Sequence, residues 1–237
     1  MKQKQLFYNS ELNETTKLFS FSKDESRHIV KVLRKSTGDP LTITNGVGWI
    51  FEAEIIVPNH NKCVVEIQKS KYIHPKNYSV HLAVSPTKLN DRYEWFLEKV
   101  TEIGVTKITP VISHNSERKI IKSERFKKII QSATKQSLNP YLPSLNPAVT
   151  FSKFLKIPQK GKTYIAHCAG GEKHPFKDHI EAGKSVTILI GPEGGFSSEE
   201  ISTAIKNNYI PVSLGSSRLR TETAAIVACH TIQLCNE

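Results

Sequence analysis

The hydrophobic pattern divides the chain near residue 73. Over residues 41–44 and 50–55, apolar and polar side chains alternate with a period of two, which is typical of a strand with one buried face. Residues 63–67 continue this pattern, and the Asn45-Gly46-Val47-Gly48 sequence is a turn signal. Short strands joined by tight turns predict a small β-barrel domain over residues 1–72.

One helix interrupts these strands. Ser22 has the character of an N-cap, and Glu25 stands three residues later at the capping-box position. The pattern therefore predicts a helix that runs from this point to about Arg34.

A linker over residues 69–77 leads into a second pattern, in which strands and helices alternate. The apolar runs predict strands at residues 79–84, 108–112, 163–166, 186–190 and 211–214. Amphipathic spacing and capping signals predict helices at residues 91–103, 123–137, 175–181, from 197 onward and 221–234. This alternation predicts an α/β domain over residues 73–237, in which a parallel sheet has helices on both faces and binds ligands at the carboxyl ends of its strands.

Charge narrows the class of partner. The 237 residues carry a formal net charge of +11, which favours a polyanionic partner and leaves RNA, DNA and anionic lipid open. Residues 118–135 hold seven basic side chains and the single acid Glu124, so a helix there presents a basic face able to neutralise phosphates. A solvated helix face is the structural alternative.

Other features limit location and metal chemistry. No apolar run approaches the roughly 18 residues needed to span a bilayer, and the polar N-terminus has no signal-peptide pattern. The four cysteines form no CxxC pair or zinc-type cluster. We therefore expect free thiols, no metal, no membrane attachment and a cytoplasmic location.

Two glycine-containing segments follow predicted strands. Gly191-Pro192-Glu193-Gly194-Gly195 precedes a capped helix, and its glycines allow a flat ligand to approach the backbone. A tight strand-to-helix turn is the plain alternative. In the second segment, residues 214–225, a glycine loop leads to a helix start, and Arg220 either points at the strand-end cleft or pairs with Glu222 or Glu193. No phosphate-binding loop is present, because both Gly-Lys pairs lack the upstream glycine.

These segments carry a family resemblance. GPEGGFSSEEI and LGSSRLRTETAA, in this order and spacing, resemble the SPOUT class of RNA methyltransferases, and within it the ribosomal RNA small subunit methyltransferase E family, which makes N3-methyluridine in 16S rRNA. Residues 27–34, 99–105, 115–118, 125–126 and 136–137 are similar to further motifs of that family. The chain departs from the pattern at residues 138–140, which lack a usual arginine, at Phe126 and at Arg218.

The resemblance implies a PUA-like RNA-binding barrel in residues 1–72 and a SPOUT domain in residues 73–237. It implies that the SPOUT domain contains a deep trefoil knot and forms a homodimer. It also implies that S-adenosylmethionine binds in the knot, mostly through backbone groups. The residues carried over as cofactor-binding are His167, Leu189, Gly191, Pro192, Gly194, Gly195, Leu214, Gly215, Ser217 and Leu219.

Methylation at uridine N3 requires loss of the imide proton, so negative charge spreads onto O2 and O4 of the base. A permanently charged arginine can stabilise that charge, and we expect Arg220 to do so. Glu193 or Glu222 accepts the proton or orients the arginine, and the sequence leaves this choice open. The expected RNA contacts are Arg27, His28, Lys31 and Arg34 in the first domain and Lys88, Arg92, Arg118 and Arg125 in the second.

The expected partners are therefore 16S rRNA within the small ribosomal subunit and a second copy of the chain. Two other functions are alternatives. One is a non-catalytic RNA-binding protein of ribosome assembly, and the other is a SPOUT methyltransferase that acts on another RNA. The intact glycine and arginine motifs argue against the first, and the N-terminal barrel argues against the second.

Overall fold

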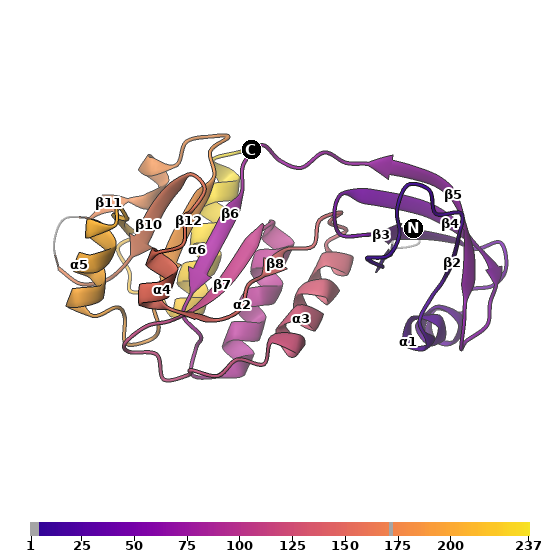
Figure 1. The fold of residues 1–237 in the computed structure, drawn as a ribbon, viewed down its shortest axis with the longest axis horizontal. Coiled ribbons are helices and arrows are strands. Elements are labelled where there is room, and N and C mark those ends of the chain that lie inside the picture. The colour runs from indigo at the N-terminus through magenta and orange to yellow at the C-terminus, as the bar shows by residue number, and fades with distance from the viewer. Residues whose placement is uncertain (1–4, 171–172) are drawn as a thin grey trace. The chain divides into compact units, whose positions relative to one another are not determined.

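Strand pairing in the computed structural model, which describes residues 5–170 and 173–237, changes from mainly antiparallel to parallel near residue 75. The chain forms two compact units, one of Met1–Pro75 with Thr134–Leu142 and one of Lys76–Ala133 with Pro143–Glu237. Figure 1 shows the elements of each.

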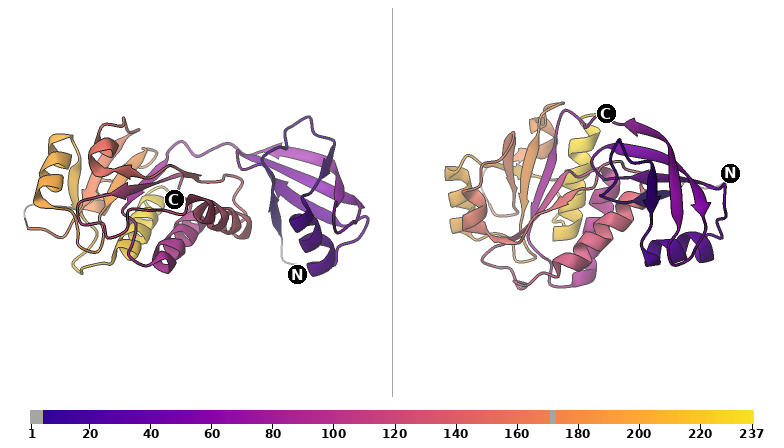
Figure 2. Two further views of the ribbon diagram at one scale, coloured as in Figure 1. Left: turned by 60° about the horizontal axis from the view of Figure 1, so that its bottom comes forward. Right: turned by 45° about the vertical axis from the view of Figure 1, so that its right-hand side comes forward.

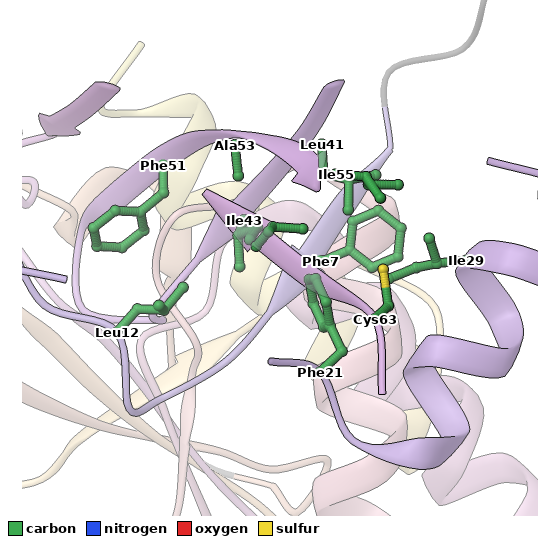
Figure 3. Close-up of a cluster of buried hydrophobic side chains, with 11 residues drawn as sticks. Phe7, Leu12, Phe21, Ile29, Leu41, Ile43, Phe51, Ala53, Ile55 and Cys63 are labelled. Carbon is green, nitrogen blue, oxygen red and sulfur yellow. The ribbon is translucent and has the colours of Figure 1, made fainter. Parts of the chain in front are cut away.

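The first unit is a curled five-stranded sheet with the order β1-β3-β4-β5-β2. Its strands are β1 (Leu6–Tyr8), β2 (Leu18–Ser20), β3 (Pro40–Thr44), β4 (Trp49–Val57) and β5 (Val64–Tyr72). The predicted turn joins β3 to β4, and it requires glycine because Gly46 and Gly48 have φ of 77° and 100°. Figure 3 shows the core that the sheet encloses, where Ile29, Ile43, Phe51 and Ile55 are fully buried.

The helix of the first unit differs from the continuous one predicted. Helix α1 (Lys23–Arg27) begins as expected, because the Ser22 side chain accepts a hydrogen bond from the Glu25 amide. It continues as a π-helix over His28–Val32, in which the Leu33 amide donates to the His28 carbonyl. The wider turn lets Ile29, Val30 and Leu33 all pack against the core.

A distant segment completes the first unit. The carbonyl of Pro140 accepts a hydrogen bond from the Thr44 hydroxyl at 3.0 Å, and the Leu142 amide donates to the Gly46 carbonyl at 2.9 Å. Lys135 also forms an ion pair with Glu25 at 2.7 Å. Because these partners lie about a hundred positions away in the sequence, no local pattern signals the segment.

The second unit contains an all-parallel sheet with the order β11-β13-β10-β12-β6-β7-β8. Its strands are β6 (Val80–Val84), β7 (Lys107–Ile112), β8 (Ser144–Leu145), β10 (Lys162–Ala166), β11 (His174–Pro175), β12 (Val186–Ile190) and β13 (Ile210–Ser213), with β9 (Val149–Thr150) paired to β7. The central strands β6 and β12 are buried along their whole length, as expected where both faces are covered.

Helices cover both faces of this sheet, as Figure 2 shows. The helices are α2 (Asn90–Ile103), α4 (Phe151–Leu155), a 3-10 turn (Phe176–His179), α5 (Ser198–Lys206) and α6 (Thr221–Leu234), and α3 (Ser123–Gln136) packs Phe126 against Tyr93 of α2. Helices α4 and α5 share a core with Ala83 and Leu189, and α6 packs on α2 across the other face. The Gly104 cap of α2, with φ of 110°, and the Ser197–Glu200 capping box of α5 are both confirmed.

The predicted α/β architecture of two domains is confirmed, whereas the trefoil knot stays a prediction. The short strands β1, β2, β8, β9 and β11 and helix α4 were missed because two to five residues carry too little periodicity to be recognised. No described helix is long and apolar enough to cross a membrane. All four cysteines are free thiols, and Cys63 and Cys229 are buried.

Candidate active site

A cavity of about 700 Å³ opens at the carboxyl ends of β10, β12 and β13, which are neighbours in the sheet. Parallel strands place their carboxyl ends at the same edge, so the loops that follow them meet there. The cavity is lined by ten of the residues predicted to act in catalysis or cofactor binding: His167, Gly191, Pro192, Glu193, Gly195, Leu214, Gly215, Ser217, Leu219 and Arg220.

The turn after β12 is held by hydrogen bonds within the turn and from two other segments of the chain. The Gly195 amide donates to the Pro192 carbonyl at 2.8 Å, and the Thr221 hydroxyl donates to the Gly191 carbonyl at 2.9 Å. Asn115 donates to the carbonyls of Gly194 and Gly195 at 3.2 and 3.1 Å. Gly195 has φ of 69°, and a Cβ there would meet no atom within 4 Å, so its open side faces space rather than protein.

The loop after β13 is held much more loosely. Residues 215–218 are exposed, and the Ser213 hydroxyl makes the local bonds to Gly215, donating to its carbonyl at 2.9 Å and accepting from its amide at 3.3 Å. Gly215 has φ of 142°, and a Cβ there would also meet nothing. The loop ends at Arg220, the N-cap of α6.

The three candidate catalytic residues have different surroundings. Arg220 is exposed on the cavity and forms no ion pair with a described carboxylate. Glu193 lines the cavity too, and its carboxylate accepts a hydrogen bond from the Lys88 amide at 3.0 Å. Glu222 is buried outside the cavity lining, 3.8 Å from the Arg92 guanidinium, and its Oε2 has no hydrogen-bond partner among the residues that the structure describes. Neither glutamate pairs with Arg220.

His167 follows β10 and is the candidate for contact with a ligand through its ring. Both of its ring nitrogens are shielded from solvent and have no side-chain hydrogen-bond partner among the described residues. Burial lowers the pKa of this imidazole, and the nearby Lys173 ammonium lowers it further, whereas the backbone of Ala169 lies close enough to the ring to raise it. A neutral ring that has no such side-chain partner and lies beside a cavity is suited to hydrogen bonding with a bound molecule.

Two predicted cofactor residues lie outside the cavity lining. Leu189 is fully buried between β6 and β10 and packs into the core under α4 and α5. Gly194 is exposed, and a Cβ there would come within 3.1 Å of the Asn115 Cβ. Ser216 and Arg218 line the cavity as members of the 214–219 loop, whereas sequence reasoning missed Phe196 and Lys173, which also line it.

The predicted RNA-binding residues separate into two sets. In the first unit, Arg27, His28, Lys31 and Arg34 are exposed on or beside the π-helix. In the second unit, three of the four predicted side chains already have a carboxylate partner: Lys88 lies 2.9 Å from Glu117, Arg92 lies 3.8 Å from Glu222, and the Arg125 guanidinium contacts both carboxylate oxygens of Glu94. Arg118 is half-buried.

A family model described as an RNA methyltransferase domain matches residues 74–233, and one described as an RNA methyltransferase PUA domain matches residues 21–68. The ribosomal RNA small subunit methyltransferase E of Rickettsia conorii is 31% identical over 237 residues, which cover 99% of this chain and 96% of the relative. The chain belongs to the ribosomal RNA small subunit methyltransferase E family. The family member of Buchnera aphidicola from Acyrthosiphon pisum is 34% identical, with 91% and 87% of the two chains covered.

Solved structures agree with this membership in the methyltransferase E family. A probable rRNA-methyltransferase of Porphyromonas gingivalis has a TM-score of 0.90 at 38% identity, with 98% of this chain and 99% of that chain covered. The methyltransferase E of Neisseria gonorrhoeae, bound to S-adenosyl methionine, has a TM-score of 0.86 at 27% identity, with 99% and 98% covered.

The residues of this methyltransferase E family member fit such a cofactor. The cavity volume lies in the range of small-molecule sites, roughly 300–1,000 Å³. Gly195 and Gly215 leave open space where a side chain would intrude, and His167 supplies ring nitrogens that have no side-chain partner among the described residues. Among the described residues, no group of three or more His, Cys, Asp or Glu could hold a metal ion.

Proposed function

We propose that this protein transfers a methyl group from S-adenosylmethionine to N3 of a specific uridine in 16S rRNA of the small ribosomal subunit. The observation that carries the proposal is the single cavity shared by the 191–195 turn, the 214–220 loop and Arg220. Membership in the methyltransferase E family supports the choice of substrate. When bound, the cofactor supplies an electrophilic methyl group on a sulfonium.

Arg220 is the proposed catalytic residue. Its guanidinium is permanently charged, exposed on the cavity and free of ion pairs with described carboxylates, so it is available to a base. A planar donor fork can stabilise negative charge that develops on O2 and O4 of uridine as N3 loses its proton.

Glu193 is the proposed proton acceptor, because it lines the cavity and Glu222 does not. The Lys88 amide holds one of its carboxylate oxygens, which orients the side chain. Glu222 is buried beside Arg92 and in this proposal acts only by positioning that arginine.

Cofactor contacts in this proposal come from His167, the 191–195 turn and the 214–219 loop. The exposed Arg27, His28, Lys31 and Arg34 bind RNA phosphates from the first unit. Lys88, Arg92, Arg118 and Arg125 contribute from the second unit, three of them by exchanging a carboxylate partner for phosphate. We further propose a knotted homodimer that acts in the cytoplasm, where its ribosomal substrate is found.

The proposal is tested by mass-spectrometric mapping of modified nucleosides in 16S rRNA from a strain that lacks the protein. One N3-methyluridine should disappear, and purified protein with S-adenosylmethionine should restore it in isolated 30S subunits. Loss of a different nucleoside would favour a methyltransferase of another RNA position. An unchanged set of nucleosides, with no activity on 30S subunits, would favour a non-catalytic role.

A further inference from the structure

The β7–α3 loop holds the 191–195 turn from behind. The side-chain amide of Asn115 in this loop donates to two successive carbonyls, those of Gly194 and Gly195, at 3.2 and 3.1 Å. Its own amide oxygen faces the His114 ring at 2.9 Å, which fixes the orientation of the Asn115 side chain. Asn115 does not line the cavity, so it touches the turn and not the space in front of it.

A second tie joins the same loop to the helix that follows the turn. The His114 amide donates to Oε1 of Glu200 at 2.8 Å, while Oε2 of Glu200 accepts from the Ser197 amide at 2.9 Å in the capping box of α5. The turn is therefore fixed at its end by Asn115 and beyond its end by Glu200. The loop itself is anchored by the buried Ser113 and Ser116, whose hydroxyls lie 3.0 Å apart.

We infer that Asn115 is a positioning residue for cofactor binding, an inference that rests on the proposed function. Its two hydrogen bonds hold the peptide units of Gly194 and Gly195 in the arrangement that opens the cavity beside Gly195, where φ is 69°. An asparagine is suited to this because one NH₂ group can donate to two carbonyls at once. Without it, the turn must be ordered at the expense of binding free energy.

The test is the affinity of purified full-length protein for S-adenosylmethionine and S-adenosylhomocysteine, measured by calorimetry. Asn115→Ala should weaken both by about tenfold, the effect of one to two lost hydrogen bonds. Asn115→Asp should weaken them more, because it places a carboxylate against two carbonyl oxygens. At saturating cofactor, kcat on 30S subunits should stay within about twofold of wild type for Asn115→Ala, so the loss should appear in KM.

Asn207→Ala is the matched control. Asn207 is also an exposed asparagine of the second unit whose side chain donates to a backbone carbonyl, that of Thr203 at 2.8 Å, and it does not line the cavity. The affinity of Asn207→Ala for S-adenosylmethionine should equal that of the wild type. Equal affinity in Asn115→Ala, or an equal loss in Asn207→Ala, would overturn the inference. A wild-type protein that binds no cofactor and methylates no RNA would instead overturn the proposed function.

Discussion

The two sides of the cavity are built differently. On one side, the turn after β12 has its carbonyls and its glutamate bonded to other parts of the protein, through Asn115, Thr221 and Lys88. On the other side, residues 215–218 of the loop after β13 are exposed and, within the described part of the chain, bond only to Ser213, and the ring nitrogens of His167 after β10 have no side-chain partner there. The first side is held in place by the protein, whereas the second presents exposed polar groups and the shielded ring of His167 to a ligand.

This difference separates residues that shape the cavity from residues that contact the ligand. Residues on the satisfied side should determine whether the cavity has the right shape. Residues on the unsatisfied side should determine contact with ligand and substrate. Three predictions test that separation, and a fourth concerns His81, a fully bonded histidine outside the cavity.

The largest effect is expected at Arg220, the end of the loosely held loop. Arg220→Ala should lower kcat for methylation of 30S subunits by about 10²–10³-fold, because it removes the charge that stabilises the developing anion. Arg218→Ala is the control, since Arg218 is exposed on the same loop and lines the same cavity. Transfer of labelled methyl groups measures both variants, and equal losses would show that the charge of the loop matters and not one position.

A second histidine, His81, differs from His167 because both of its ring nitrogens are hydrogen-bonded to side chains. His81 is buried between Thr109 and Gln159, which bond its two nitrogens at 2.7 and 2.9 Å. Burial and the nearby Lys107 lower its pKa from 6.5 to about 4. Between pH 6.5 and pH 4, the unfolded chain therefore binds a proton that the folded chain does not. The free energy of unfolding decreases as the pH is lowered through that window.

We expect His81 to account for a loss of about 3 kcal/mol in the free energy of unfolding between pH 7 and pH 4. Urea unfolding across this range should show a loss smaller by about that amount in His81→Gln. The same substitution at the exposed His230 should not change how the free energy of unfolding depends on pH. An identical profile in His81→Gln and wild type would exclude the ring as the cause.

Gly195 and Gly215 compare the two sides directly. Both have positive φ and open space for a Cβ, so Ala introduces backbone strain at each position without a clash. Because the held turn cannot move away, the Cβ of Gly195→Ala would stand in the cavity, and S-adenosylmethionine binding should weaken by about tenfold. The loop after β13 can readjust, so Gly215→Ala should have a smaller effect. Calorimetry of the two variants would contradict the comparison if Gly215→Ala were the weaker binder.

The smallest effect is expected at His167. Its pKa is lowered by burial and by Lys173, so the ring is neutral at pH 7 and gains charge only as the pH falls below the ordinary value of 6.5. The added charge on His167 repels S-adenosylmethionine, which has a net positive charge. The affinity for S-adenosylmethionine should therefore fall roughly three- to fivefold as the pH is lowered below 6.5. His167→Gln should bind with an affinity that does not change over the same range. A fall of equal size in the variant would assign the pH dependence to another group.

Much of the fold could be predicted because its signals are local. The unbroken apolar run of β12, the Ser197 capping box and the glycine cap at Gly104 are each contained within a few residues. The motifs at 191–195 and 214–225 also predicted that their residues meet, since the carboxyl ends of neighbouring parallel strands share one edge. The roles of Glu193 and Glu222 could not be separated in this way, because both belong to glycine-containing segments that the sequence places next to the same cleft.

The sequence by itself determined the alternation of strands and helices, the turns that need glycine, and the family to which the motifs point. Only the tertiary structure decided that Glu193 faces the cavity while Glu222 is buried beside Arg92, that Asn115 supports the turn, and that residues 134–142 complete the first unit. The reason is the range of the interactions. Periodicity and capping depend on neighbours in the chain, whereas burial and pairing depend on residues that folding brings together from distant positions.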